Sequence, residues 1–279
     1  MSRSANAEES TGNPTFLAQV QERLRSANRE RWFRAMVRWK KHARSAGFFD
    51  LYPRFFSTSA TASAPDRLNQ RHRALIQSNA GIISGRSILD IASHDGRWSL
   101  AANKAGAKYV LGIEARPHLI EAARVNMREC GVPEGQVEFV QGDLMVELDR
   151  LESGRFDTVF CLGFFYHTID HMSLLRKIAR LKPTSLVMDT RISTRPGSII
   201  EVYDEPVEEE SAAAVGDPGN PARAVKGYPT RAALDLMLKA VGFSDLHYYN
   251  WRNAGIERWD DLKAYYLGMR VTVTAMAAK

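Results

Sequence analysis

Strand-like and helix-like segments alternate along most of this chain, and the alternation limits the possible folds more than any other feature. Five apolar runs rich in β-branched and aromatic residues appear in the order SILDIA, YVLGIEA, VEFVQGD, FDTVFCLGFF and SLVMDTRI. Helix-like stretches follow several of these runs. Such alternation is typical of a parallel sheet that helices cover on both faces. The sequence therefore predicts an α/β fold with a doubly wound sheet.

Two further strand-like segments, DLHYYNW and RVTVTAMA, close the predicted sheet. They follow the helix-like segment PTRAALDLMLKAVG. Residues 193–227 precede that helix, are rich in Pro, Gly and acidic side chains, and are too long for a simple connection. We expect this insertion to form a lid.

The N-terminal part is expected to be organised differently. We predict a disordered tail over residues 1–15, a helical arm over 16–72 and the α/β domain over 73–279. Between residues 21 and 46, nine Lys or Arg side chains stand against two Glu, and aromatic residues lie among them at helical spacing. Two interpretations stay open: a solvated helix that packs its aromatic face on the main domain, or a surface that binds nucleic acid.

The composition indicates neither a membrane protein nor a secreted one. No apolar stretch is long enough to cross a bilayer, and the N-terminal residues lack the apolar core of a signal peptide. Cys130 and Cys161 show no pairing pattern. We expect a cytoplasmic protein with no membrane partner, and the sequence leaves its oligomeric state open.

A glycine-poor loop follows the first predicted strand, within LDIASHDGRWSL at residues 89–100. Loops that place a diphosphate on a helix N-terminus carry three glycines. Here Ala92 and His94 take two of those positions and only Gly96 remains, while Asp95 would repel a diphosphate. The loop therefore favours a cofactor that has no phosphate groups.

Three acidic residues, Asp90, Glu114 and Asp143, stand at or just after successive predicted strands. Ligands of such sheets bind beyond the carboxyl ends of the strands. A carboxylate at the end of the second strand, where Glu114 stands, can accept hydrogen bonds from both ribose hydroxyls of an adenosine. Taken alone, this feature fits NAD equally well.

The motifs LDIASHDG, GIEA, QGDL, FDTVFCLGFFYH and SLVMDTRI occur in an order and spacing that resemble those of the class I S-adenosylmethionine-dependent methyltransferases. The resemblance covers about residues 73–275. It implies a Rossmann-like, seven-stranded sheet and S-adenosyl-L-methionine as the cofactor. The ASHDGRWS version of the loop resembles that of bacterial enzymes that methylate hydroxyls of small molecules, sugars among them.

The same resemblance implies a role for each part of the site. Asp90 and the backbone of residues 92–96 would hold the amino-acid end of the cofactor, Glu114 its ribose, Asp143 with Leu144 its adenine, and Leu162 with Gly163 the floor beneath the methyl group. The residues expected to contact the cofactor are Asp90, Ala92, Ser93, His94, Gly96, Glu114, Ala115, Asp143, Leu144 and Leu162.

Two residues are candidates for acting on the acceptor. A hydroxyl acceptor needs a base, and His167 in GFFYH ends the fourth strand on the side expected to face the methyl group. Helix capping is the alternative role for His167. Asp189, with Arg191 at the tip of the fifth strand, is expected to bind a polar acceptor or to form a salt bridge. Tyr166 and Phe165 wall the acceptor pocket or belong to the core.

Several alternatives remain open. His167, Asp170, His171 and Asp189 are metal-ligand types, but their spacing matches no strong signature, so no metal is predicted. The GFFYH segment also resembles the bacterial transfer-RNA wobble-uridine carboxymethyltransferase, which makes nucleic acid an alternative partner to a small-molecule acceptor. A non-catalytic or NAD-dependent nucleotide-binding protein is the remaining class.

Overall fold

A seven-stranded sheet forms the centre of the computed structural model, which describes residues 47–57, 64–206, 222–256 and 259–278. The strand order is β3-β2-β1-β4-β5-β9-β8. The first five strands pair in parallel, and β9 pairs antiparallel with both β5 and β8. The predicted α/β fold and its seven strands are confirmed. The strands are β1 Ser87–Ile91, β2 Tyr109–Glu114, β3 Val137–Gln141, β4 Thr158–Leu162, β5 Ser185–Arg191, β8 Phe243–Tyr248 and β9 Arg270–Ala277.

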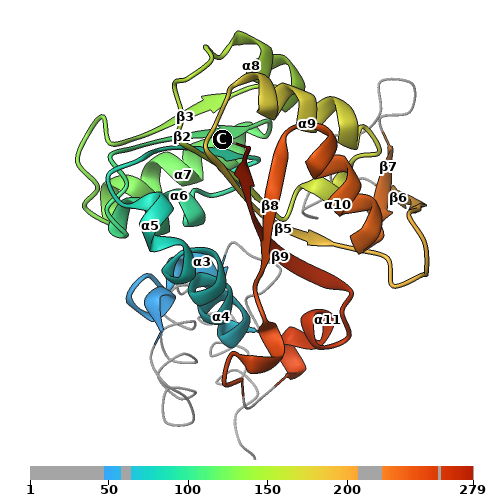
Figure 1. The fold of residues 1–279 in the computed structure, drawn as a ribbon. Coiled ribbons are helices and arrows are strands. Elements are labelled where there is room, and N and C mark those ends of the chain that lie inside the picture. Colours follow the sequence, from blue (N-terminus) through green and yellow to red (C-terminus); the bar gives the residue numbers. More distant parts are fainter. Residues whose placement is uncertain (1–46, 58–63, 207–221, 257–258, 279) are drawn as a thin grey trace, which may run out of the picture.

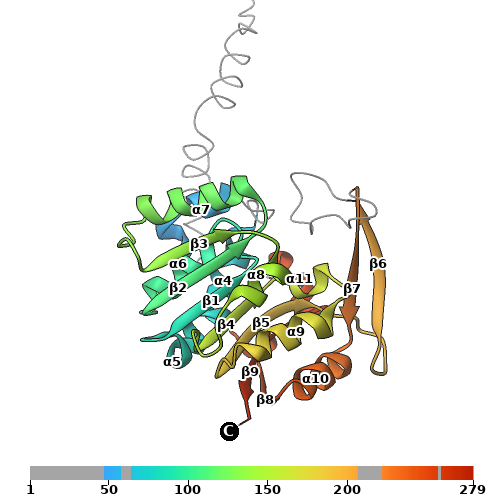
Figure 2. The ribbon, with the colours of Figure 1, turned by 90° about the horizontal axis from the view of Figure 1, so that it is seen from above.

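The central strands are apolar along their length because both of their faces are buried. Leu89, Val159 and Leu186 point to one face, into a core shared with α8, α9 and α10. Ile88 and Val110 point to the other face, where α4, α5, α6 and α7 pack. Figures 1 and 2 show these two helical layers on either side of the sheet. The helices are α3 Arg54–Ser57, α4 Pro65–Leu75, α5 Ala80–Ile83, α6 Arg97–Lys104, α7 Pro117–Glu129, α8 Leu144–Arg150, α9 His171–Arg180, α10 Arg231–Ala240 and α11 Lys263–Tyr266.

The described parts of the 193–227 insertion form regular structure. Strands β6 (Ile200–Pro206) and β7 (Arg223–Pro229) pair as an antiparallel ribbon, separate from the main sheet. The side-chain oxygen of Thr230 anchors the base of the ribbon: it donates to the Gly197 carbonyl at 2.7 Å and caps α10. Figure 2 shows the ribbon at one side of the molecule. Residues 207–221, between the two strands, lie outside the described residues.

Most of the predicted N-terminal tail and arm, including the basic stretch of residues 21–46, also lies outside the described residues. The described remainder of the arm packs on the sheet. Phe49, Phe55 and Phe56 are fully buried in the same core as Leu68 of α4 and Trp98 of α6. Residues 47–57 and α4 therefore cover the α6 side of the sheet.

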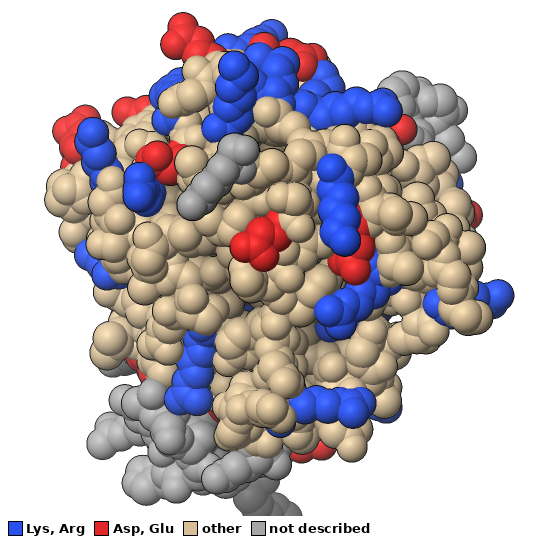
Figure 3. Space-filling view, in the orientation of Figure 1, with Lys and Arg blue, Asp and Glu red and all other residues tan. Residues whose placement is uncertain are grey.

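No helix within the described ranges combines the length and apolar character that crossing a bilayer requires. On the face drawn in Figure 3, Lys and Arg side chains gather at the top, in the region of α8 and α9, with acidic side chains among them. The centre of that face carries few charges. The basic side chains visible on this face are therefore found mainly at its top.

Candidate cofactor and acceptor site

A pocket of about 460 Å³ opens at the carboxyl ends of β1, β2 and β4, where the strand order reverses. Its size and its place at this switch point are typical of a small-molecule site in an open α/β sheet. Seven of the predicted cofactor residues line it: Ala92, His94, Glu114, Ala115, Asp143, Leu144 and Leu162. The other three, Asp90, Ser93 and Gly96, are buried behind the lining.

The loop after β1 keeps the backbone path of a glycine-rich loop without the glycines. Ala92 and His94 have φ angles of 53° and 55°, in the left-handed region that favours glycine. Gly96 has a φ of 77°, and a Cβ built there would lie 2.8 Å from the Phe139 ring. Left-handed backbone costs a non-glycine residue roughly 1–2 kcal/mol. Because neither position is a glycine, the loop is strained at two residues that line the pocket.

Glu114 is held in one orientation at the end of β2. One carboxylate oxygen accepts a hydrogen bond from the His94 backbone N–H at 3.0 Å. The other accepts from the Arg116 backbone N–H at 3.1 Å and from its Nε at 2.9 Å. The carboxyl group is almost fully buried and lines the pocket. Because each carboxylate oxygen has about two acceptor sites, the oxygen bonded to His94 retains one site for a ribose hydroxyl, and a second hydroxyl would have to replace an Arg116 donor on the other oxygen.

The two other acids of the loop region are buried and do not line the pocket. Burial raises the pKa of Asp90 to about 7, although Ser99 donates a hydrogen bond to it at 2.7 Å. For Asp95, burial works to raise the pKa, but Arg97 and His94 outweigh it and hold the pKa below its ordinary value. Arg97 Nε lies 2.7 Å from Asp95. The expected repulsion of a diphosphate by Asp95 is therefore wrong, because Arg97 neutralises that charge inside the protein.

Asp143 and Leu144 lie at the start of α8, a helix that the sequence analysis did not identify. Asp143 caps the helix by accepting a hydrogen bond from the Val146 N–H at 3.1 Å. Both residues line the pocket across from the β1 loop, on the far side of Glu114. Carboxylate and apolar groups together suit a purine, whose amino group donates and whose faces are apolar.

His167 lies on the wall of the pocket, at the end of a short 3-10 helix (Phe165–His167) that follows β4. It does not cap α9, whose N-cap is Asp170. Its Nδ1 lies 3.5 Å from Oε2 of Glu205 on the ribbon, and neither atom has a hydrogen-bond partner among the described residues. Burial lowers the pKa of His167 to about 4 despite the opposing effect of Glu205. The imidazole is thus neutral near pH 7 and able to accept a proton.

Asp189 does not reach the pocket. It is fully buried beneath the pocket floor and accepts hydrogen bonds from Arg71 at 3.1 Å and Arg270 at 2.6 Å. Tyr265 and Thr272 donate to its other oxygen at 2.8 and 2.9 Å. Burial opposes ionisation, but Arg270 and Arg71 lower the pKa of Asp189 to about 2. A direct role in binding or deprotonating the acceptor does not fit this position, and Asp189 instead holds two arginines in place.

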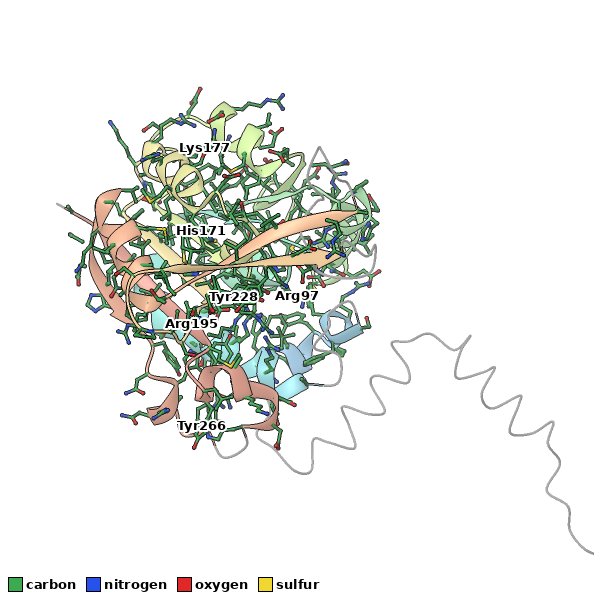
Figure 4. The ribbon with its side chains drawn as sticks, turned by 90° about the vertical axis from the view of Figure 1, so that its right-hand side faces the viewer. Arg97, His171, Lys177, Arg195, Tyr228 and Tyr266 are labelled. Atoms are coloured by element: carbon green, nitrogen blue, oxygen red, sulfur yellow. The ribbon has the colours of Figure 1, made fainter. Side chains whose placement is uncertain are left out.

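The structure separates Phe165 and Tyr166 of the GFFYH segment. Phe165 is fully buried in the core and stacks on His171, whereas Tyr166 lines the pocket. Tyr228 of the ribbon packs edge-on against Tyr166, with ring centroids 5.7 Å apart. Figure 4, viewed from the ribbon's side, labels Tyr228 and Arg97 in the central part of the molecule, away from Lys177 and Tyr266 at its ends.

Sequence reasoning missed several residues that the fold brings to this site. Arg67 and Arg71 come from α4, Arg270 from the start of β9, and Glu205 from the ribbon. The three arginines line the pocket, and Glu205 faces His167. No motif identified them, because they stand on α4, β9 and the ribbon, outside the strand-end motifs.

The described residues contain no group of three His, Cys, Asp or Glu side chains placed to hold a metal ion. In particular, His171 is buried against Phe165, and Asp189 is enclosed by its arginine and hydroxyl partners. The HTIDH segment therefore does not bring its acidic and histidine side chains together with Asp189 at one point.

Parts of the chain are similar in sequence to known proteins. Residues 88–183 match the model of a methyltransferase domain. Over 126 residues, the chain is 32% identical to the ubiquinone biosynthesis O-methyltransferase of Bordetella avium. The matched region makes up 45% of this chain and 50% of that protein. It is 28% identical over 181 residues to the tRNA U34 carboxymethyltransferase of Pseudomonas savastanoi, covering 63% of this chain and 50% of that protein. The chain thus spans about half the length of these relatives.

A solved structure shares the fold. The N-terminal domain of EvdMO1, crystallised in the presence of SAH and D-fucose, superposes with a TM-score of 0.54 at 21% identity. The match covers 75% of this chain and 82% of that one. Over the matched region the two proteins share one architecture.

Proposed function

We propose that this chain, a class I S-adenosylmethionine-dependent methyltransferase, transfers a methyl group to a hydroxyl of a small molecule. The observation that carries the proposal is the pairing of two features in one pocket. Glu114 is an anchored acceptor for a ribose at one end, and His167 is a neutral imidazole at the other. A base is needed for a hydroxyl acceptor and not for a free amine, so the position of His167 favours O-methylation.

The residues present suit the cofactor. Ala92 and His94, with left-handed backbone, line the pocket beside Glu114, and Glu114 and Asp143 would supply acceptors for ribose and adenine. When bound, S-adenosylmethionine supplies an electrophilic methyl group on a sulfonium. Leu162 and Gly163, at the end of β4, form the part of the lining that leads from the cofactor side to His167.

In the proposed reaction the chain's own groups align and deprotonate the acceptor. Methyl transfer is an in-line displacement, so holding the acceptor oxygen in line with the methyl carbon is the main contribution of the pocket. Nε2 of His167, the ring nitrogen that does not face Glu205, takes the hydroxyl proton as the oxygen attacks. The Glu205 carboxylate, 3.5 Å from Nδ1, then stabilises the imidazolium that forms.

We further propose that residues 193–227 act as a lid and that residues 73–279 form the catalytic domain. Ala224 and Val225 of β7 line the pocket, so the ribbon contributes directly to the acceptor side. Closure of such segments excludes water from a reacting nucleophile.

Modification of a transfer RNA is the alternative function. It is supported by the similarity to the tRNA U34 carboxymethyltransferase and by the excess of basic residues between positions 21 and 46. Binding to RNA that weakens steeply with salt would favour this alternative, whereas indifference to RNA favours a small acceptor.

Mass spectrometry tests the proposed function directly. The full chain is incubated with S-adenosylmethionine and a panel of hydroxylated sugars and phenols, with matched amines alongside. Gain of one methyl group on a hydroxyl, lost in the His167→Ala variant, supports the proposal. Methylation confined to the amines would contradict it.

A further inference from the structure

Positive charge is concentrated on one side of the pocket, and the function proposed above does not use it. The guanidinium groups belong to residues from three elements: Arg67 and Arg71 on α4, Arg191 at the end of β5 and Arg270 at the start of β9. All four line the pocket. A single buried carboxylate, Asp189, pairs with Arg71 and Arg270. Among the described residues, no carboxylate lies within ion-pair distance of Arg67 or Arg191.

Two of these four arginines are largely removed from water. The side chains of Arg71 and Arg270 are 9% and 3% exposed. The Nε atoms of Arg67 and Arg71 are buried and have no hydrogen-bond partner among the described residues. Burial and the neighbouring guanidiniums of Arg71 and Arg270 lower the pKa of Arg67. Leaving a buried donor unpaired is unfavourable, and a bound acceptor atom removes that cost.

The arginines converge on the acceptor side. A Cβ built on Gly163, directly after β4, would lie 3.3 Å from Nη2 of Arg270 and 3.8 Å from Nη2 of Arg71. The Arg270 guanidinium also lies over the Tyr166 ring, 5.5 Å from its centroid. Tyr166 is adjacent to His167, so the cationic groups and the proposed base share one end of the pocket.

We propose that the methyl acceptor carries an anionic oxygen group, a carboxylate or a phosphate, which binds to Arg67 and Arg71. This inference rests on the proposed function and specifies its substrate class. Arginine forks match carboxylate and phosphate oxygens in paired hydrogen bonds. Such an anion would offset the unbalanced positive charge, satisfy the buried Nε donors and orient the hydroxyl toward His167.

The cofactor's own carboxylate is the other source of an anion at these arginines, and the test separates the two. The full chain is saturated with S-adenosylhomocysteine, and benzoate, phenyl phosphate and the neutral benzamide are each titrated into it by calorimetry. We expect benzoate or phenyl phosphate to bind at least about ten-fold more tightly than benzamide, a difference typical of a charge-assisted contact. Equal binding of the three probes would overturn the proposal.

Two variants complete the experiment. Arg67→Gln should abolish the preference for the anionic probes and leave the affinity for S-adenosylhomocysteine within about two-fold, a change worth under 1 kcal/mol. Arg128→Gln, on the exposed side of α7, should behave as the wild type. Loss of S-adenosylhomocysteine affinity in Arg67→Gln would assign the arginine to the cofactor and overturn the inference. If Arg67→Gln fails to fold, Arg67→Met, which keeps the apolar stem of the side chain, is measured in the same way.

The inference and the proposed function fail separately. Absence of S-adenosylhomocysteine binding would contradict the proposed function, and the three probes would then be titrated into the free chain. A preference for the anionic probes in the free chain that Arg67→Gln removes still supports an anion site. If the free chain shows no preference for the anionic probes, the proposed anion site is contradicted.

Discussion

Nδ1 of His167, on the main domain, lies 3.5 Å from Oε2 of Glu205, on the inserted ribbon. Both atoms are buried and lack a hydrogen-bond partner among the described residues. The other oxygen of Glu205 accepts from Lys226 Nζ at 2.5 Å. The ribbon thus places a carboxylate beside the proposed base.

Replacing His167 tests its role as the base. His167→Ala should lower kcat by roughly 10²–10⁴-fold, which is the usual effect of losing a general base. The affinity for S-adenosylhomocysteine should stay nearly unchanged. His247→Ala, an exposed histidine on β8, is the matched control. Wild-type turnover in His167→Ala would remove this residue from the mechanism.

The pH dependence of the rate should reflect the lowered pKa of His167. The neutral imidazole is the active form, and its pKa is about 4 rather than the ordinary 6.5. The rate should therefore stay level as the pH falls through 6.5 and decline only near pH 4. A steady-state pH profile measured alongside a stability control checks this. A decline centred near pH 6.5 would show that the imidazole is not desolvated as the structure indicates.

Glu205 should act as a positioning residue. In Glu205→Gln, kcat should fall by about ten-fold while KM changes little, because the imidazolium loses a partner worth about 1–2 kcal/mol. The pKa of His167 should also fall further, since Glu205 raises it. Glu201→Gln, on the same ribbon and paired with Arg195, serves as the control. Equal effects of the two substitutions would indicate a general effect on the ribbon.

Because the loop after β1 is strained, a glycine substitution there should not lower the free energy of unfolding. Ala92→Gly should leave the free energy of unfolding unchanged or raise it by up to about 1 kcal/mol, because relief of left-handed strain offsets the entropy of the unfolded chain. Ala122→Gly, within α7, should lower it by about 1 kcal/mol. Chemical denaturation measures both. A loss in Ala92→Gly as large as that in Ala122→Gly would contradict the strain assigned to the loop.

The fold and the cofactor side of the site were predictable because their signals are local. Each strand is a contiguous apolar run, and Glu114 and Asp143 stand directly at strand ends, so position in the sequence gives position in the pocket. The ribbon was harder to predict: the Pro, Gly and acidic content of residues 193–227 is typical of a loop and hides the two strands of the ribbon. Helix α8 was not predicted because its seven residues are too few to show a clear helical pattern.

The acceptor side was not predictable, because distant segments build it. Arg71 and Arg270 are brought together by Asp189, a contact between three elements that no spacing rule reveals. From the sequence, Asp189 had the features of a ligand at a strand tip. Its burial beneath the floor depends on where α4 and β9 pack, which is a property of the assembled fold.

Calorimetric titration with S-adenosylhomocysteine, comparing the wild type with Glu114→Gln, measures whether this pocket binds the cofactor through Glu114. One molecule should bind per wild-type chain. Glu114→Gln should bind at least about 100-fold more weakly, because two charge-assisted hydrogen bonds to the ribose, each worth roughly 1.5–3 kcal/mol, are weakened or lost. Glu129→Gln, on the exposed end of α7, should bind as the wild type does. Equal affinity of the wild type and Glu114→Gln, or no binding by either, would contradict the assignment of this pocket to the cofactor.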